Sequence, residues 1–350
     1  RNPGVRAGFR RARECETPAS ERVFAERENG TMHAPHRQIT VVAALLVGVL
    51  VAVQSRINAE LTDYVGNGVV AAAISFGTGL VLVVAIILSR SQYRASLPKI
   101  PAALRDGRLH WWQLLGGLGG AWLVTTQGLV VTVVGVMTFT IAVVAGQVTG
   151  SLLVDRAGLS PAGRMAVTPN RAIAAGIAFV AVALAGMHGS SFSLSWVVVL
   201  AVSAGLAIAV QQAINARVAV ASGQPLTATL VNFIVGFTGL LLVSLVVLAS
   251  GAASFGTWPS QWWLYLGGPI GVTFIALAAW AVHGVGVLVF GLLSIAGQLL
   301  GSVIIDLVAP AHATSFGWTQ WVGLALIAVA VALATSPGRD RLARKVFSRN

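Results

Sequence analysis

Two pairs of amide side chains interrupt an otherwise apolar sequence. Residues 54–58 read QSRIN and residues 211–215 read QQAIN, so a Gln and an Asn four positions apart occur twice. Positions i and i+4 lie on the same face of an α-helix, so both side chains of each pair can bind the same ligand. Because an amide both donates and accepts hydrogen bonds, the pattern suits the binding of neutral or zwitterionic polar solutes.

Other isolated polar residues extend this set of candidate substrate-binding side chains. The helical rise per residue, counted from the ends of the apolar runs, divides the set into two layers. The outer layer contains Gln54, Asn58, Ser75, Gln127 and Gln298. The inner layer contains Gln147, Gln211, Asn215 and Asn232. The alternative that stays open is that these amides only join helices to one another, without a ligand.

Two aspartates, Asp155 and Asp306, are expected at the ends of apolar runs, whereas Glu60 and Asp63 are assigned to an outer loop. Helix ends avoid most of the free energy that a charge loses at the centre of a bilayer. We therefore interpret Asp155 and Asp306 as capping or gating groups in preference to proton carriers. If transport is coupled to protons, these two carboxylates are the leading candidates.

Enzyme chemistry finds little support in the sequence. His188 and His283 are isolated at helix ends, and no Ser, His and Asp combination suggests a catalytic triad. Cys15 is the single cysteine, which excludes an internal disulfide and a cysteine-based metal site. We expect no catalytic residue, no metal and no cofactor.

The elements that must position the polar residues are apolar runs of membrane-spanning length. The chain has 350 residues, of which 56% are hydrophobic and only 10% charged. Since no water satisfies the backbone inside a bilayer, such runs must be helices. The predicted fold is an all-α polytopic membrane protein with ten runs, near 39–57, 69–89, 111–132, 134–154, 172–187, 195–215, 226–250, 262–282, 285–305 and 318–335.

The distribution of positive charge predicts the orientation. Of the 23 Lys and Arg residues, 22 lie in the two tails and in alternate loops, with Arg56 as the exception, which places both termini in the cytoplasm. The net charge of +12 is therefore a topology signal and does not indicate nucleic acid. We expect a disordered basic tail over 1–38 and a basic cytoplasmic tail over 336–350. Residues 1–31 are either sequence upstream of a start at Met32 or a genuine tail.

The polar motifs recur because the sequence contains an internal repeat. Residues 48–79 align without gaps on 205–236 at an offset of 157. WWQLLGG (111–117) and GQVTGSLLVD (146–155) match WWLYLGG and GQLLGSVIID at an offset of 151. We predict two five-helix repeats, 39–188 and 195–335. Because five is an odd number, the second repeat enters the membrane inverted, as in many secondary transporters.

These motifs resemble those of a known group. Q-x-x-x-N on the first helix, F-x-x-G on the second and G-Q-x-x-G-S-x-x-x-D on the fourth resemble the drug/metabolite transporter superfamily, in its bacterial YdcZ-like, EamA-related branch of inner-membrane exporters. The resemblance implies a central cavity formed by helices 1–4 and 6–9, with helices 5 and 10 peripheral. The first helix lacks the membrane-embedded Glu of the small multidrug members, which argues against proton-coupled efflux of cationic drugs.

The sequence therefore predicts a secondary transporter of the bacterial inner membrane. Its expected activity is export of a small polar metabolite or drug-like solute, by alternating access at the interface of the repeats. The expected partners are that solute and the lipid bilayer, with a homodimer left open and no nucleic acid. The alternatives are a non-transporting membrane scaffold and, less favoured, an intramembrane enzyme that processes lipids.

Overall fold

The computed structural model is helical, without strands, in the residues that it describes, namely 34–159, 161, 163–164, 167–186, 196–251, 256–285, 287–309 and 317–335. The predictions for the two tails and for His188 lie outside these residues, and the side chain of His283 is also outside the description. The chain divides into two units, Arg1–Ile39 and Thr40–Asn350, and the description below concerns the second. The all-α class is confirmed.

Nine long helices and several short ones make up the described chain. The long helices are α3 (Ala34–Val65), α4 (Gly68–Ser89), α7 (Gly116–Ala157), α8 (Pro169–Gly186), α9 (Trp196–Ser222), α10 (Pro225–Ala249), α11 (Gly267–Val285), α12 (Val287–Val308) and α13 (Trp318–Thr335). The short helices are α5 (Ser91–Arg94), α6 (Lys99–Arg105) and two 3-10 helices, η1 (Trp111–Leu115) and η2 (Trp262–Leu266).

Several of these helices can cross a membrane. Five described segments have the length and the apolar composition to do so, namely Gln38–Val65, Gly68–Ser89, Trp111–Ala157, Trp196–Ser222 and Pro225–Ala249. Shorter apolar helices follow at Pro169–Leu184, Trp262–Ala278, Leu293–Val308 and Trp318–Leu333. The chain is a polytopic membrane protein, and the number of ten crossings stays a prediction.

The assignment of Glu60 and Asp63 to a loop is wrong, and the first helix does contain a Glu. Helix α3 continues to Val65, and Glu60 forms an i, i+4 ion pair with Arg56 at 3.6 Å on this helix. The apolar run that predicted the helix ends too early because it ignores periodicity. Leu61 and Val65 lie one turn apart and are fully buried, so an apolar stripe extends the helix beyond the run of apolar residues.

The two predicted runs 111–132 and 134–154 form one element with a break inside it. Helix α7 leaves helical geometry at Gly135, where φ is 78° and ψ is 167°. A backbone with this positive φ is open to glycine and strained for residues with a Cβ. One helical run therefore ends at Gly135 and the next begins at Val136, without a polar loop between them.

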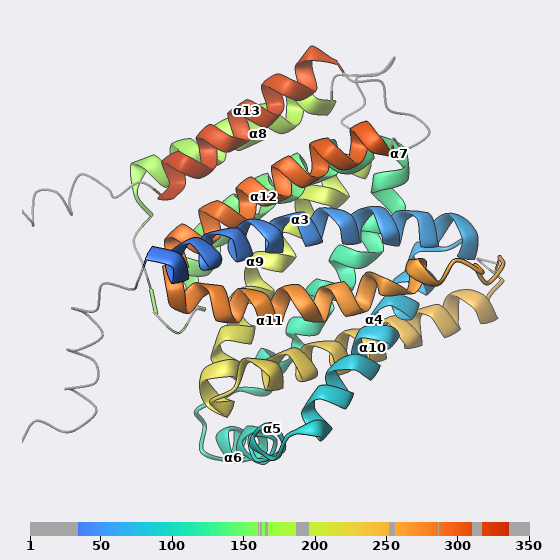
Figure 1. Cartoon of the computed structure of the whole chain (residues 1–350), viewed down its shortest axis with the longest axis vertical. Coiled ribbons are helices and arrows are strands. Elements are labelled where there is room, and N and C mark those ends of the chain that lie inside the picture. Colours follow the sequence, from blue (N-terminus) through green and yellow to red (C-terminus); the bar gives the residue numbers. More distant parts are fainter. Residues whose placement is uncertain are drawn as a thin grey trace, which may run out of the picture. The chain divides into compact units, whose positions relative to one another are not determined.

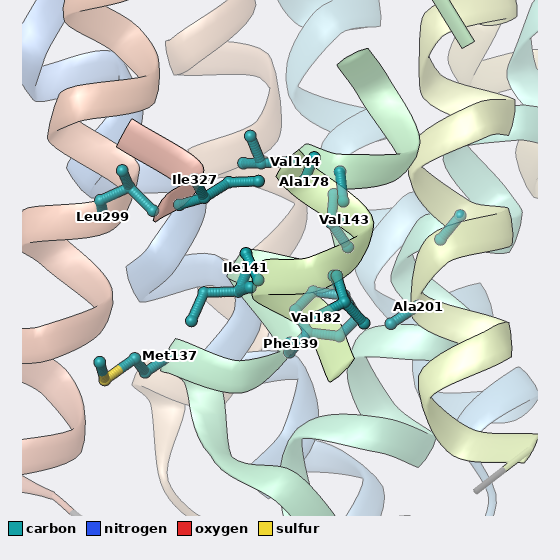
Figure 2. Close-up of a cluster of buried hydrophobic side chains, with 14 of the residues drawn as sticks. Met137, Phe139, Ile141, Val143, Val144, Ala178, Val182, Ala201, Leu299 and Ile327 are labelled. Carbon is teal, nitrogen blue, oxygen red and sulfur yellow. The ribbon is translucent and has the colours of Figure 1, made fainter. Parts of the chain in front are cut away.

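The stretch of α7 after Gly135 lies at the centre of the largest apolar cluster. Figure 2 shows Met137, Phe139 and Ile141 of this stretch among side chains from other helices. The labelled neighbours are Ala178 and Val182 of α8, Ala201 of α9, Leu299 of α12 and Ile327 of α13. Burial on all sides explains why this stretch carries β-branched and aromatic residues with hardly a charge.

Two further packing arrangements link distant parts of the sequence. Helices α8 and α13 lie side by side along their lengths (Figure 1). Helix α4 packs against α7, α10 and α11. Phe76 of α4 and Phe233 of α10 meet there with ring centroids 5.1 Å apart. Contacts between the sequence halves therefore build the core.

Candidate functional site

One group of buried polar side chains forms where α3 meets α7 and the start of α11. Gln54 Nε2 donates to the carbonyl oxygen of Gly267 at 2.7 Å, and Asn58 Nδ2 donates to Gln127 Oε1 at 2.6 Å. Gln127 Nε2 in turn donates to Ser55 Oγ at 3.0 Å. Each of these polar side chains is at most 4% exposed. We call Gln54, Ser55, Asn58, Ser75 and Gln127 the outer group.

Two acceptors of the outer group are unsatisfied. Asn58 Oδ1 and Ser75 Oγ are buried and have no hydrogen-bond partner among the described residues. Both lie against the α-carbon of Gly267, where an added Cβ would overlap them. A buried polar atom without a partner loses about 1–3 kcal/mol of hydration. The group thus retains capacity to accept hydrogen bonds from a ligand or from water.

A second group forms where α9 meets α10 and the start of α7. Gln211 Nε2 and Asn215 Nδ2 both donate to Asn232 Oδ1, at 2.6 Å and 2.9 Å. Gln211 Oε1 is buried without a hydrogen-bond partner among the described residues. Gln211 lies against Gly120, and Asn215 lies against Gly116. We call Gln211, Asn215 and Asn232 the inner group.

One residue difference explains why the two groups bond differently. Ser75 is aligned with Asn232 in the repeat, at an offset of 157. The Asn232 carbonyl accepts from both neighbouring amides, whereas Ser75 offers a shorter side chain and makes neither bond. In the outer group Gln54 donates to the carbonyl oxygen of Gly267 and Asn58 donates to Gln127 Oε1 instead.

Gln147 and Gln298 join neither group. Gln298 is 8% exposed and Gln147 is half-buried, and neither side chain forms a hydrogen bond within the described residues. Their backbone nitrogens lie against Gly205 and Gly48, where a Cβ would overlap them. The structure thus unites seven of the nine predicted side chains in two groups, and it places the other two at helix crossings.

Contacts between the sequence halves occur in matched pairs. Asn58 lies against Gly267 as Asn215 lies against Gly116, and Gln54 lies against Gly271 as Gln211 lies against Gly120. Where helices cross closely, contacts also come in equivalent pairs, one in each half. Ser75 against Gly268 corresponds to Asn232 against Gly117, Leu45 against Gly297 to Val202 against Gly146, and Ala52 against Gly301 to Ala209 against Gly150. Residues separated by the repeat offsets therefore occupy equivalent places against the opposite half.

The two aspartates make different bonds. The side chain of Asp155 is 17% exposed, and its Oδ2 lies 2.6 Å from Arg171 Nη1. Asp306 is 2% exposed and accepts two backbone hydrogen bonds, from Val136 N to Oδ1 at 2.9 Å and from Met137 N to Oδ2 at 2.6 Å. It caps the helix that resumes after Gly135, where free N–H groups favour an anion.

Sequence reasoning missed two contributors to these arrangements. Ser55 accepts from Gln127, and its place beside Gln54 in QSRIN was the available signal. Gly267 carries the carbonyl that receives Gln54, and the repeated Gly-Gly after each Trp-Trp pair marked that position.

Metal-binding chemistry has no candidate in the part of the chain that the structure describes. No three His, Cys, Asp or Glu residues come together there. The outer and inner groups contain amides and hydroxyls alone, so their chemistry is hydrogen bonding to a polar partner.

The family model described as "Putative inner membrane exporter, YdcZ" matches residues 39–184 and 196–333. The chain belongs to this family. The membership confirms the resemblance carried by the amide, phenylalanine and aspartate motifs. It also makes the chain a multi-pass protein of the inner membrane, in a family described as exporters.

Two individual proteins are similar to this member of the YdcZ family. "Inner membrane protein YdcZ" of Escherichia coli (strain K12) is 30% identical over 108 residues, which are 30% of this chain and 71% of that protein. A solved structure described as "Crystal structure of protein" covers 89% of this chain and 98% of its own, with a TM-score of 0.48 and 18% identity.

Proposed function

We propose that this YdcZ-family member is a secondary transporter that exports a small polar metabolite or drug-like solute. Two inverted five-helix repeats would rock against each other, with both termini in the cytoplasm. The outer and inner groups then bind the solute in turn, each facing one side of the membrane. Inverted repeats place the binding site at their interface, which is where both groups lie against the opposite half.

The matched contacts are the observation that carries this proposal. Asn58 against Gly267 and Asn215 against Gly116 are the same contact made twice, with the halves exchanged. A pseudo-two-fold relation between the halves gives the molecule two ways to close, which the two-fold rotation exchanges. Alternating access requires two conformations of this kind around one site.

Two comparisons support the duplication. The family model matches two stretches of the chain, 39–184 and 196–333, with a gap between them. The relative from Escherichia coli has 71% of its length in the 108 matched residues and is therefore shorter than half of this chain. These matches are consistent with a chain built from two related units, and if each unit has five helices the second enters the membrane with the opposite orientation.

The composition of the two groups supports a neutral or zwitterionic polar substrate. The outer and inner groups contain amide and hydroxyl side chains and no formal charge. Asn58 Oδ1, Ser75 Oγ and Gln211 Oε1 are buried acceptors without a described hydrogen-bond partner. A substrate rich in hydroxyl or amine donors satisfies them, because amide oxygens accept such bonds.

The scaffold alternative has an observation of its own. The amides of each group bond to one another or to the backbone, which is what interhelical hydrogen bonds in a membrane bundle do. In that case replacing Gln54 or Gln211 changes the free energy of unfolding, and no compound stabilises the parent protein.

Thermal stability of the purified protein across a library of metabolites and drugs tests the proposal. A compound at 100 times its dissociation constant stabilises the folded state by roughly 2.7 kcal/mol. We expect such a compound to stabilise the parent protein and Thr273→Ala, a change at an exposed position of α11. The same compound should not stabilise folded Gln54→Ala or Gln211→Ala. Stabilisation that persists in both amide variants would move the binding site elsewhere.

A further inference from the structure

Asp306 joins α12 to the point where α7 resumes after Gly135. Its two carboxylate oxygens accept from the consecutive backbone nitrogens of Val136 and Met137, at 2.9 Å and 2.6 Å. The bonds are charge-assisted and the aspartate is 2% exposed, so they form a strong connection between two helices. We call this contact the Asp306 tie.

The repeat defines an equivalent contact on the opposite side. Asp155 precedes Asp306 by the offset of 151, and the triplet Val-Gly-Val at 134–136 recurs at 285–287. Helix α11 ends at Val285 and α12 begins at Val287, as α7 breaks at Gly135. The equivalent of the Asp306 tie would therefore connect Asp155 with the backbone nitrogens of Val287 and Leu288. We call it the Asp155 tie.

Among the described residues, the first tie is present and the second is not. Asp155 binds Arg171 at 2.6 Å, and the described residues give it no bond to α12. Arg171 also donates to Ser151 Oγ at 3.3 Å, which holds the guanidinium beside α7. At the offset of 147 the counterpart of Arg171 is Trp318, so α13 offers Asp306 no such competing cation.

The two ties fall on opposite sides of the membrane. With both termini in the cytoplasm, the fourth predicted span runs inward from Val136 and ends near Asp155, and the ninth runs outward from Val287 and ends near Asp306. The Asp306 tie therefore fastens these helices together on the periplasmic side. The Asp155 tie would fasten the same two helices on the cytoplasmic side.

We propose that Asp306 and Asp155 close the two sides of the transporter in turn, each by capping the helix start that the other half presents. The proposal rests on the alternating-access function above, because exchange of conformations between the repeats makes the two ties mutually exclusive. In this structure the periplasmic side is tied and the cytoplasmic side is released. Arg171 is the positioning residue that holds Asp155 away from α12 in this state.

Access from the periplasm to a buried reporter measures the tie. Ala71 of α4 is 1% exposed and lies one turn before Ser75 on the same helix face, between the helix start and the outer group. A Cys15→Ser background with Ala71→Cys carries one reactive thiol. The readout is the rate at which a membrane-impermeant maleimide labels it from outside in intact spheroplasts.

Removing the Asp306 tie should raise this rate. Asp306→Asn loses the charge and one of the two acceptors, and we expect roughly tenfold faster labelling, the ratio that corresponds to one charge-assisted hydrogen bond. Arg171→Ala removes the cation that binds Asp155, so Asp155 can form the Asp155 tie on the cytoplasmic side. The labelling rate should therefore also rise, although Asp306 itself is unchanged. Asp155→Asn should leave the rate equal or lower. The matched control is Glu60→Gln, a carboxylate of α3 that pairs with Arg56 and caps no helix.

Two results would overturn the gate. One is parent-like labelling in both Asp306→Asn and Arg171→Ala, each shown to be folded by a monodisperse elution profile in detergent. The other is an equal rise in Asp155→Asn or Glu60→Gln. A ligand response that depends on Gln54 and Gln211, together with unchanged labelling, would overturn the gate while the transport function stands. Altered labelling in the predicted order without any stabilising ligand would support the gate and contradict the assigned binding groups.

Discussion

At the scale of single residues, one side chain determines how a whole group is bonded. Asn232 Oδ1 receives hydrogen bonds from Gln211 and from Asn215. At the equivalent place Ser75 receives none, and its own oxygen is unsatisfied. The same pair of amides, Gln then Asn, therefore lies in two different networks. The inner group depends on a single shared acceptor, whereas the outer group is spread over α3, α4 and α7 and also bonds to the backbone of α11.

We predict opposite effects from truncating the two equivalent residues. Asn232→Ala leaves the buried amide of Gln211 and the half-buried amide of Asn215 without an acceptor, and the free energy of unfolding should fall by about 1–3 kcal/mol. Ser75→Ala removes an oxygen that has no partner and should leave stability unchanged or slightly higher. Thermal unfolding of both variants in the same detergent compares them. Equal losses would show that the Asn232 bonds add little stability.

At the scale of elements, a single glycine allows α7 to carry two apolar runs without a loop. Gly135 takes a φ of 78° and a ψ of 167°, which places the free N–H groups of Val136 and Met137 inside the bundle. Asp306 supplies the acceptors that these groups need. The break and the buried carboxylate therefore depend on each other, since either alone leaves polar groups unsatisfied.

Gly135→Ala should destabilise the protein by roughly 1–3 kcal/mol, because a Cβ is strained at this backbone geometry. The control is Gly176→Ala in α8, a helical glycine where an added Cβ meets no atom within 4 Å. That change should be neutral or stabilising, since alanine favours helix by up to about 1 kcal/mol over glycine. The thermal unfolding midpoints of the two variants test this prediction. A larger decrease for Gly176→Ala than for Gly135→Ala would contradict it.

At the scale of the whole molecule, the two halves hold each other through backbone crossings at glycine. Gly205 lies against the backbone of Val143 and Gln147, and Gly146 lies against Val202. The matched crossing has Gly48 against Ser294 and Gln298, and Gly297 against Leu45. Small residues permit this close approach, and the dispersion contacts that follow stabilise helix pairs in a membrane. Each half thus buries in the other the surfaces it would expose alone.

We predict that the halves assemble when expressed as separate chains, 1–190 and 191–350. An affinity tag on one half should recover the other after extraction in mild detergent. Gly205→Leu should abolish this recovery, because a side chain there overlaps the backbone of α7. Gly291→Ala serves as the control, since nothing lies within 4 Å of an added Cβ at that position. Recovery that survives Gly205→Leu would mean that other contacts hold the halves together.

The helical class and the identity of the amides could be predicted because both depend on local chemistry. Runs of apolar residues must form helices in a bilayer, and Gln54, Asn58, Gln211 and Asn215 attract notice because amides are rare in such runs. The end of α3 was placed too early, since an i, i+4 ion pair and a buried stripe carry the helix through Glu60 and Asp63.

The sequence by itself determined the all-α class, most of the buried polar residues and their recurrence in the two halves, because composition, spacing and repetition are properties of the chain. Only the tertiary structure decided which atoms meet. Asp155 and Asp306 are equivalent in sequence, yet one pairs with Arg171 and the other caps Val136 and Met137. The physical reason is that a hydrogen-bond partner is selected by distance in the folded bundle, where residues 170 positions apart lie 2.9 Å from each other.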